Sequence, residues 1–452
     1  MLRYNNTMQI KLPPYVVEIL DKFEKAGFEV YIVGGAVRNI LMGRKPPDWD
    51  FTTNATPEEI LKIFPDGFYD NSFGTVGISH KSSKKPYEIT TFRREVGYSD
   101  KRHPDKIEWG KTLKEDLARR DFTINAMALD KGQKLTDPFG GQGDLKKKII
   151  KAVGDPVKRF REDALRMMRA VRIAAELGFV ITEATFEAIK MHADSIKHVS
   201  VERIHDELFR ILASDYPYEG MAMLHNSGLM HQIIPEFEDG FGVEQKSPGR
   251  HHIYDVGTHS LLSLKNCPST DPLVRFATLI HDIGKPQTRR VAKGGIITFY
   301  NHEVVGSRIA KVIADRLRFS KHDRDKLWML VRRHQFVVDE KQTDSAIRRF
   351  IKNVGRENIQ DMLDLRVGDR LGGGAKETSW RFEKFKKRIK EVQKQPFSVN
   401  DLKVDGKDVM KALGIKSGPK VGEILGKLFS EVEKDQKKNN KEYLLGRIKK
   451  YE

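Results

Sequence analysis

Two aspartates separated by one residue, Asp48 and Asp50, are residues whose type and spacing could perform chemistry. On a β-strand, alternate side chains project from the same face, so a strand here would present both carboxylates together. Two carboxylates on one face can hold a pair of divalent metal ions, which is the geometry that in-line phosphoryl or nucleotidyl transfer requires. On its own such a pair is more commonly a solvated surface feature, so the neighbouring segments decide between these interpretations.

Two glycines, Gly34 and Gly35, come directly after residues 28–33, whose β-branched and aromatic side chains predict a buried strand. Glycine lets the backbone approach a ligand closely, and the N-terminus of the helix that follows offers free N–H groups to a phosphate. A strand is also expected over residues 87–92. If this strand lies beside the aspartates, Glu88 becomes a third acid near the metals; otherwise it is an edge-strand surface residue.

Further along, an acid and three arginines recur at intervals of three residues within one expected helix, which places them on a slanting stripe of its surface. They are Asp163, Arg166, Arg169 and Arg172. Apolar residues of the same helix already supply a buried side, so this spacing favours an anionic partner over a salt-bridged surface. Arg120 could likewise hold a triphosphate, because a guanidinium fork matches phosphate oxygens; the alternative is an ion-paired helix start.

The elements that position these residues divide the chain in two. Strands and helices alternate up to residue 150, and long helices follow from Asp155. With 452 residues the chain is too long for one core, so roughly two to four domains are expected.

The net charge of +18 points to a polyanionic partner, RNA or DNA. The single cysteine, Cys267, excludes an intramolecular disulfide framework, and no apolar run approaches the ~20 residues of a membrane span, so we expect a cytoplasmic protein.

A series of motifs occurs in order over roughly the first half of the chain. The motifs are Gly34-Gly35 with Arg38 and Asp48-x-Asp50, Arg119-Arg120-Asp121-Phe-Thr-Ile-Asn125-Ala, Asp137-Pro with Gly143-Asp144, Glu162-Asp163-x-x-Arg166-x-x-Arg169-x-x-Arg172, and Glu202-Arg203-Ile. This series resembles the class II tRNA nucleotidyltransferase (CCA-adding enzyme) and bacterial poly(A) polymerase family. The resemblance implies an α+β chain, with a polymerase-β-like nucleotidyltransferase head built on a small mixed or antiparallel sheet, followed by all-α domains.

The resemblance also implies roles for the site residues. Asp48 and Asp50, with Glu88 beside them, would bind two magnesium ions, one activating the tRNA 3′-hydroxyl and one holding the triphosphate. Asp163 and Arg166 would read the base of the incoming nucleotide. The remaining nucleotide contacts would be Gly34, Gly35, Arg38, Arg120, Arg169 and Arg172. The implied substrates are tRNA, CTP and ATP.

Hydrogen-bond chemistry supports base reading by an acid and an arginine. A carboxylate accepts from the exocyclic amine of C or A, and an adjacent guanidinium donates to the ring nitrogen or carbonyl beside it. U and G present a carbonyl in place of that amine, and a buried mismatch of this kind costs ~1–3 kcal/mol per group. Asp163 and Arg166 could therefore select C and A without a nucleic-acid template.

Three segments bear on which member of the family this chain is. Residues 93–104 resemble the complete flexible loop that supports A addition, so full CCA addition is favoured and A-only addition is the alternative. Residues 44–48 do not resemble the basic stretch of the poly(A) polymerases. Where the family has Asp after Arg38, this chain has Asn39, which would alter nucleotide affinity if that Asp orients the arginine.

A second series lies in the other half of the chain. It comprises Val256-Gly-Thr-His259, Leu279-Ile-His281-Asp282-Ile-Gly-Lys285, Asn301-His302-Glu303, His334 and Arg366-Val-Gly-Asp369, and it resembles the HD metal-dependent phosphohydrolase domain. Matching residue by residue gives the ligands His259, His281, Asp282 and Asp369, with His302 and His334 available for a second metal or for phosphate. Imidazoles with carboxylates suit a transition metal or magnesium, which can activate water for hydrolysis. An RNA-end phosphohydrolase and a non-catalytic RNA-binding scaffold are therefore the alternatives to nucleotidyl transfer as the main role.

The last part of the chain is strongly basic. A basic helix over 380–394 is followed by a lysine-rich glycine turn over 414–422, which could dock an RNA backbone or form a helix–helix corner. The resemblance makes this segment a tRNA-binding tail. The expected domains are the head (1–153), the neck (154–235), the HD domain (236–375) and the tail (376–452). The sequence does not determine the oligomeric state, although a monomer is favoured.

Overall fold

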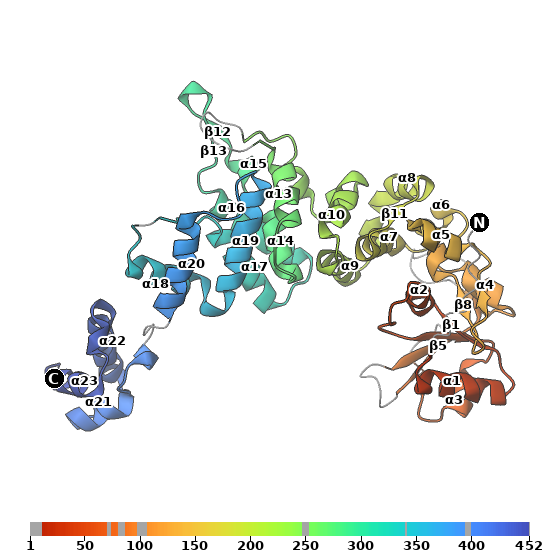
Figure 1. Ribbon diagram of the computed structural model, residues 1–452, viewed down its shortest axis with the longest axis horizontal. Helices are drawn as coiled ribbons and strands as arrows, with labels where there is room; N and C mark the ends of the chain where they lie inside the picture. Colours follow the sequence, from red (N-terminus) through yellow and green to blue (C-terminus); the bar gives the residue numbers. More distant parts are fainter. Residues whose placement is uncertain are drawn as a thin grey trace.

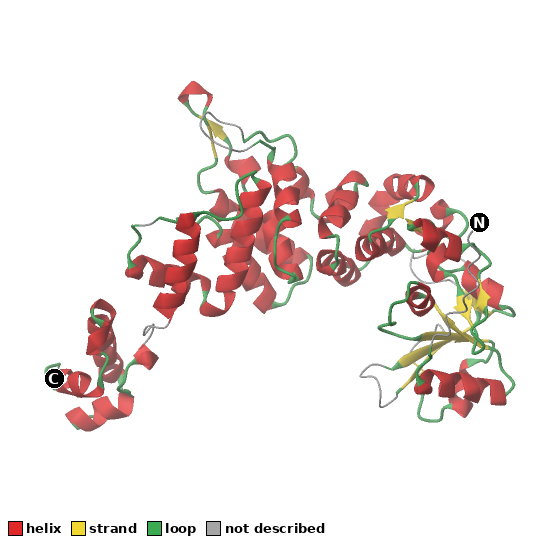
Figure 2. Ribbon diagram, viewed as in Figure 1, coloured by secondary structure: helices red, strands yellow, loops and turns green. Residues whose placement is uncertain are grey.

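The chain forms an extended series of domains, with a sheet-containing head at one end and a small helical tail at the other (Figures 1 and 2). The computed structural model describes residues 11–69, 74–79, 86–96, 106–245, 253–339, 341–393 and 399–451. The α+β class is confirmed, because the large sheet lies wholly in the head and helices dominate the rest (Figure 2). No helix of the described ranges is long and apolar enough to cross a membrane.

The head is built on a seven-stranded mixed sheet in the order β3-β4-β5-β2-β1-β8-β9. Its strands are β1 (Val30–Val33), β2 (Asp50–Thr53), β3 (Phe68–Tyr69), β4 (Thr75–Ile78), β5 (Tyr87–Thr91), β8 (Ala128–Leu129) and β9 (Leu135–Thr136). β2 and β5 run parallel, and the other neighbours run antiparallel. A separate hairpin pairs β6 (Arg93–Val96) with β7 (Lys106–Trp109). The strand expected over residues 87–92 is present as β5 and lies between β4 and the aspartate strand β2, so Glu88 is not on an edge strand.

Short helices complete the head. They are α1 (Pro14–Lys25), α2 (Gly35–Leu41), α3 (Pro57–Ile63), α4 (Leu113–Ala118) and α5 (Gly141–Lys147). Side chains of α1, α2 and α3 pack with the sheet in this core. Local signals set the helix starts: Thr56 accepts from the Glu59 backbone N–H while the Glu59 carboxylate accepts from the Thr56 N–H, which is a complete capping box.

The neck and the HD domain are helical. The neck contains α6 (Pro156–Glu162), α7 (Leu165–Leu177), α8 (Glu183–His192), α9 (Val201–Ala213), α10 (Pro217–Asn226), α11 (Leu229–Ile233) and α12 (Pro235–Glu238), with β10 (Ile149–Ile150) paired to β11 (Val180–Ile181). The HD domain contains α13 (Val256–Lys265), α14 (Pro272–Ile280), α15 (Lys285–Thr288), α16 (His302–Arg316), α17 (Lys321–Arg333), α18 (Asp344–Val354), α19 (Ile359–Gly372) and the hairpin of β12 (Arg290–Val291) and β13 (Ile297–Thr298).

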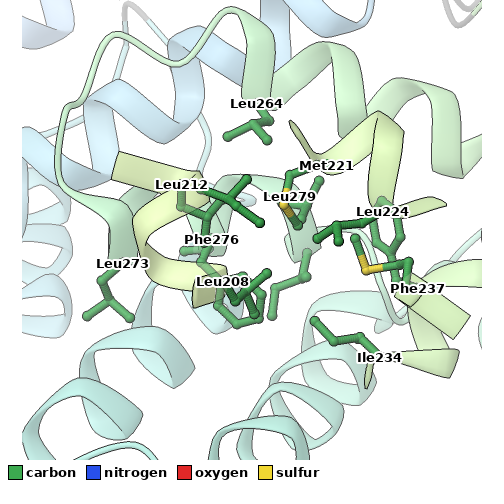
Figure 3. Close-up of a cluster of buried hydrophobic side chains, with 14 of the residues drawn as sticks. Leu208, Leu212, Met221, Leu224, Ile234, Phe237, Leu264, Leu273, Phe276 and Leu279 are labelled. Atoms are coloured by element: carbon green, nitrogen blue, oxygen red, sulfur yellow. The ribbon is translucent and has the colours of Figure 1, made fainter. Parts of the chain in front are cut away.

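One continuous apolar core joins the neck to the HD domain. Leu208 and Leu212 of the neck helix α9 lie beside Phe276 and Leu279 of the HD helix α14, and all four are fully buried (Figure 3). Burial of apolar side chains is the dominant favourable term in folding, so this shared core fixes the two domains together.

The tail has a separate core. Its helices α21 (Gly406–Leu413), α22 (Pro419–Lys434) and α23 (Lys441–Ile448) bury their own apolar set, which includes Val409, Leu428 and Leu444. The basic helix α20 (Trp380–Gln393) instead packs Phe382, Phe385 and Ile389 into the core of the neck and HD domain. Packing therefore groups α20 with the HD domain, whereas a boundary at residue 376 assigns it to the tail.

Candidate active site

A cavity of about 400 Å³ lies where the head meets the neck. The predicted site residues that line it are Gly34, Gly35, Asp50, Glu88, Arg120, Asp163, Arg166 and Arg169. The acids come from β2 and β5, the glycines from the start of α2, and Arg120 from the turn after α4. The neck supplies the other three residues, from the turn before α7 and from α7 itself, so residues far apart in sequence meet at one place. Three other predicted site residues, Asp48, Arg38 and Arg172, are not among the described residues that line this cavity.

The acids meet at one edge of the sheet. Asp50 is the first residue of β2, and it pairs with Val33 of β1 on one side and with Glu88 of β5 on the other. Burial raises the pKa of Asp50, and the nearby charge of Asp48 raises it further while Arg120 opposes the shift. A cation would relieve this unfavourable burial of negative charge. Asp48 itself is exposed and precedes the strand, so the expectation that both aspartates lie on one strand is wrong.

Gly34 allows two charged side chains to meet over the backbone. Its φ is +69°, and a Cβ added here would lie 3.2 Å from Arg120 Nη1 and 3.4 Å from Asp50 Oδ2. Left-handed backbone favours glycine, and the close contacts leave little room for any side chain. The glycine therefore lets Arg120 lie close to the Asp50 carboxylate.

Asp116 orients Arg119 and Arg120, which both line the cavity, and it was not predicted for this role. Its carboxylate is completely buried on α4 and lies 2.7 Å from Arg119 Nη2 and 3.4 Å from Arg120 Nη2. Although burial disfavours the charged form, the two guanidinium groups outweigh it and lower the pKa of Asp116. The spacing of an acid three and four residues before two arginines was the available signal.

Arg38 is held by a relay rather than by its neighbour in sequence. Its Nη1 donates to Asn125 Oδ1 at 2.6 Å, and Asn125 Nδ2 donates to Asp121 Oδ1 at 3.1 Å. Asp121 in turn accepts from Arg169 Nη2 at 2.6 Å, so the relay joins the head to the neck helix α7. Burial opposes the charge of Asp121, but Arg169 and Asn125 outweigh it and lower the pKa of Asp121.

The expected continuous stripe over Asp163 to Arg172 is wrong, because the helix breaks at its first member. α6 ends at Glu162, Asp163 has extended backbone, and α7 begins at Leu165. The reason is a local cap: Asp163 Oδ1 accepts from the Leu165 N–H at 3.0 Å, an alternative that aspartate offers to helical backbone. Asp163 therefore points into the cavity from a turn.

Further residues hold Asp163 and Arg166 in place, and they were not predicted for this role. Arg203 Nη2 donates to Asp163 Oδ2 at 2.9 Å, and Glu162 accepts from Arg166 Nη1 at 2.6 Å. Arg166 Nη2 also donates to the backbone carbonyl of Arg119 at 3.1 Å, which ties the neck to the head. Arg172 lies elsewhere: it is buried between Glu176 and Glu207, at 2.8 and 2.5 Å. Its expected contact with a nucleotide has no support in this placement.

The predicted loop over 93–104 lies only partly in the described chain. Its first residue, Arg93, lines the cavity and pairs in register with Trp109 of β7. Residues 97–105 lie outside the described residues.

The HD residues form a second polar centre, buried in the helical body. Its six members are His259, His281, Asp282, His302, His334 and Asp369. Asp282 divides it in two, because Oδ2 faces His259 and His281 at 3.4 and 3.2 Å while Oδ1 faces His302 and His334 at 3.3 and 3.6 Å. Ligands of one tetrahedral zinc lie about 3.4 Å apart at a bond length of about 2.1 Å. Both halves therefore have ligand-like spacing.

Backbone carbonyls fix the orientation of three of these histidines. Nδ1 of His281, His302 and His334 lies 2.7, 2.8 and 2.7 Å from the carbonyl oxygens of Thr278, Phe299 and Val331. Each Nε2 is therefore turned to the centre, as in metal sites where a second contact sets the tautomer. Asp369 lies 3.3 Å from His259 Nε2 and is held by Arg366 Nη1 at 3.0 Å.

The centre binds a proton tightly when no metal is present. Burial lowers the pKa of His281, but the carboxylates of Asp282 and Asp369 outweigh burial and raise this pKa to about 10. Lys285 adds a further cation, with Nζ 2.5 Å from Asp282 Oδ2. Concentrated negative charge with neutral imidazole ligands nearby is a setting that a divalent cation can occupy in place of protons.

Family comparisons cover most of the chain. Residues 30–151 match the poly A polymerase head domain, and residues 178–241 match a probable RNA and SrmB- binding site of polymerase A. Residues 251–371 match the HD domain, and residues 341–448 match tRNA nucleotidyltransferase domain 2. Such matches imply dependence on a divalent metal.

Individual relatives carry one consistent description. A CCA-adding enzyme of Ligilactobacillus salivarius (strain UCC118) is 34% identical over 433 residues, covering 96% of this chain and 95% of that protein. A CCA-adding enzyme of Geobacillus stearothermophilus is 42% identical over 220 residues, 48% of this chain and 54% of that protein. The crystal structure of Bacillus stearothermophilus CCA-adding enzyme in complex with CTP superposes with a TM-score of 0.68 at 28% identity, covering 97% of this chain and 98% of that chain. This chain therefore belongs to the family of CCA-adding enzymes.

Proposed function

We propose that the cavity between head and neck is the nucleotidyl-transfer site with which this chain adds C, C and A to the 3′ end of tRNA, using CTP and ATP. One observation carries the assignment: acids and a phosphate-binding arginine of the head line the same cavity as Asp163 and Arg166 of the neck. The reaction joins the tRNA 3′-hydroxyl to the nucleotide α-phosphate, with pyrophosphate leaving. The membership of the chain in the CCA-adding family supports this reading.

We assign two magnesium ions to Asp48 and Asp50, with Glu88 as the neighbouring acid. Hard oxygen ligands suit magnesium, and the raised pKa of buried Asp50 marks a carboxylate that lacks a compensating cation. When bound, such ions activate the attacking hydroxyl and stabilise charge on the phosphates. The chain itself supplies positioning, because Asp116 and Gly34 direct Arg120 to the same edge of the sheet.

The base of the nucleotide is read by Asp163 and Arg166. Their contacts to Arg203 and Glu162 hold both groups in place before a nucleotide arrives, so little side-chain entropy is lost on binding. A carboxylate oxygen carries more than one lone pair, and a guanidinium has further N–H donors, so both retain capacity for a base edge. Arg169 adds positive charge from α7 and is anchored by Asp121.

Truncated tRNA distinguishes the possible activities. Substrates that lack CCA, CA or A are incubated with CTP and ATP, separately and together, and product lengths are read at nucleotide resolution. We expect C addition to the two shorter ends and A addition to the end in CC. Addition of A alone, with no C added to a shorter end, would assign the chain to the A-adding alternative. Asp50→Asn should abolish all additions and leave tRNA binding intact.

A second activity is supported by the HD centre, where four histidines meet around the two oxygens of Asp282 and Asp369 lies beside two of them. We propose metal-dependent hydrolysis of a phosphate ester there, with one or two divalent or transition metals. The test measures release of phosphate from p-nitrophenyl phosphate in magnesium, manganese, nickel and zinc. His281→Ala should remove this activity and spare nucleotide addition; retention of full activity would contradict the assignment.

The tail is the proposed tRNA-gripping domain. Its three helices carry exposed lysines and form an independent core at the end of the molecule opposite the head (Figure 1). Phosphate contacts of this kind give shape recognition of a structured RNA and depend on salt. We place the protein in the cytoplasm, where tRNA is matured.

A further inference from the structure

A cavity beside the HD centre has the features of a nucleotide-binding site. It measures about 300 Å³, within the range of small-molecule pockets, and lies between α17, α18 and α20. Its charged lining is three arginines, Arg332, Arg333 and Arg349, against one acid, Glu303, so its net charge is +2. We name it the arginine–phenylalanine cavity.

Two of its arginines are uncommitted. Within the described residues, Arg333 and Arg349 make no hydrogen bond or ion pair, and the buried Nε of Arg333 lacks a partner. Arg332 forms an ion pair with Glu303, with 3.2 Å between Nη1 and Oε1. A buried N–H without an acceptor costs free energy, so an anion that accepts from Arg333 would be stabilised. A guanidinium matches the oxygens of a phosphate in particular.

Part of the cavity lining is aromatic. Phe336 and Phe350 lie 4.7 Å apart between ring centroids, and Phe385 lies 5.3 Å from Phe350. Aromatic faces stack on nucleobases of any sequence, worth about 1–3 kcal/mol per base. A hydrogen-bonding group also lies in this lining: Gln342 Oε1 is buried without a partner, although its Nε2 donates to the Val337 carbonyl at 2.7 Å. An unsatisfied acceptor beside aromatic rings suits an exocyclic amine of a base.

A second cavity lies between this one and the HD centre. An adjoining cavity of about 340 Å³ is lined by Lys285 and His302, and the two cavities share Glu303 and Gln335. Arg333 and His334 are consecutive at the end of α17, so one faces the arginine–phenylalanine cavity while the other belongs to the metal centre. A nucleotide held in the first cavity would therefore have a neighbouring phosphate near the second.

We propose that the arginine–phenylalanine cavity binds one nucleotide unit, with its phosphate on Arg333 and Arg349 and its base against Phe336 and Phe350. The unit comes either from a free nucleotide or from a strand of RNA, since both present the same phosphate and base. Binding stands independently of hydrolysis; only the delivery of an adjacent phosphate to the HD centre rests on the proposed phosphohydrolase function.

Calorimetric titration of the full chain tests this site. All proteins carry Arg166→Ala to weaken the head pocket, and the buffer contains EDTA to keep metal from the HD centre. The probes are 5′-AMP, the dinucleotide pApA and inorganic phosphate. The double variant R333Q/R349Q should weaken AMP binding about tenfold or more. The matched control R308Q/K352Q removes the same charge from exposed positions on α16 and α18, and it should bind as the parent does.

The outcomes separate the parts of the proposal. An equal loss of AMP affinity in the control, or no loss in R333Q/R349Q, would overturn the proposal. If the double variant folds poorly, the exposed substitution R349Q is tested alone, and we expect it to weaken AMP binding about threefold. Inorganic phosphate should bind at least tenfold more weakly than AMP, and equal binding would remove the base contact. Tighter binding of pApA than AMP identifies an RNA strand, and equal binding identifies a free nucleotide. His281→Ala should leave AMP binding unchanged even where phosphatase activity is lost.

Discussion

At the residue scale, the close approach that Gly34 permits gives a sharp prediction. Gly34→Ala would place a methyl 3.2 Å from Arg120 Nη1 at a φ of +69°. We expect kcat/KM for nucleotide addition to fall by at least about tenfold, or about 1.4 kcal/mol of transition-state stabilisation. Gly43→Ala is the matched control, since its φ is +70° with nothing within 4 Å of the added methyl. Similar losses in both variants would mean that backbone strain, not crowding at Arg120, is responsible.

The family difference at Asn39 gives a second prediction. Because Asn125 holds Arg38 at 2.6 Å, restoring an acid with Asn39→Asp should change KM for CTP and ATP by less than about threefold. Asn125→Ala should raise KM about tenfold, since it releases Arg38 and uncouples Asp121. Steady-state kinetics on both variants decide the point. A large effect of Asn39→Asp with none from Asn125→Ala would contradict the relay.

The HD centre gives a pH prediction. The pKa of His281 is raised to about 10 by Asp282 and Asp369, so the metal-free imidazole keeps its proton at neutral pH. A metal needs the neutral imidazole, so binding releases this proton. Apparent affinity should therefore rise about tenfold per pH unit between about pH 6 and 8. Competition with a chromophoric chelator measures the apparent metal affinity at each pH. His322→Gln, at an exposed site on α17, should not alter the slope of affinity against pH. A flat profile would refute the assigned protonation.

At the element scale, the sequence predicted some placements and missed others for identifiable reasons. The residue pattern predicted the strand that carries Glu88 but left open whether it lies beside the aspartates, because the whole fold decides which strands are neighbours in a sheet. The structure pairs Glu88 with Asp50. The break at Asp163 was missed because a spacing of three residues fits a helix. The hydrogen bond from the Leu165 N–H to the Asp163 carboxylate competes with the helical backbone there, and the spacing does not reveal it. The burial of Arg172 depends on Glu207 from another helix, and such tertiary partners leave no periodic signal.

The tail helices give a prediction at this scale. Glu431 of α22 accepts from Arg447 Nη2 at 2.5 Å and from the hydroxyls of Tyr443 and Tyr451, and the Arg447 guanidinium lowers its pKa to about 2. Since the folded pKa lies below the usual 4.5, this stabilisation is full above about pH 4.5 and is lost as pH falls toward 2. Glu431→Gln should destabilise the tail by about 1–2 kcal/mol at pH 7 and remove this acid dependence.

Hydrogen exchange of α22 and α23 across pH measures the effect. Glu423→Gln, on the same helix with an exposed carboxylate, is the control and should change little. An unchanged acid dependence in Glu431→Gln would assign it to other groups.

At the scale of the whole molecule, two sites of different chemistry stand on one rigid unit. The neck that carries Asp163 and Arg166 shares its apolar core with the HD domain, while the tail has a core of its own. The neck therefore carries the two residues proposed to read the base on a body that includes the HD domain. The head is tied to the neck by Asp121 with Arg169 and by Arg166 with the Arg119 carbonyl.

The shared core predicts that damage in the HD domain will unfold the neck as well. Phe276 of α14 is fully buried beside Leu208 and Leu212 of α9 (Figure 3), and Phe276→Ala should cost about 3–5 kcal/mol. Hydrogen exchange should then accelerate equally in α9 and α14, with α22 unaffected because its core is separate. Thermal inactivation of CCA addition should shift to lower temperature with it, although Phe276 lines neither site.

Trp380→Ala, at a side chain that is 61% exposed, should change stability by less than about 0.5 kcal/mol. Acceleration confined to α14 would mean that neck and HD domain unfold independently, and that the neck holds its base-reading residues without support from the body.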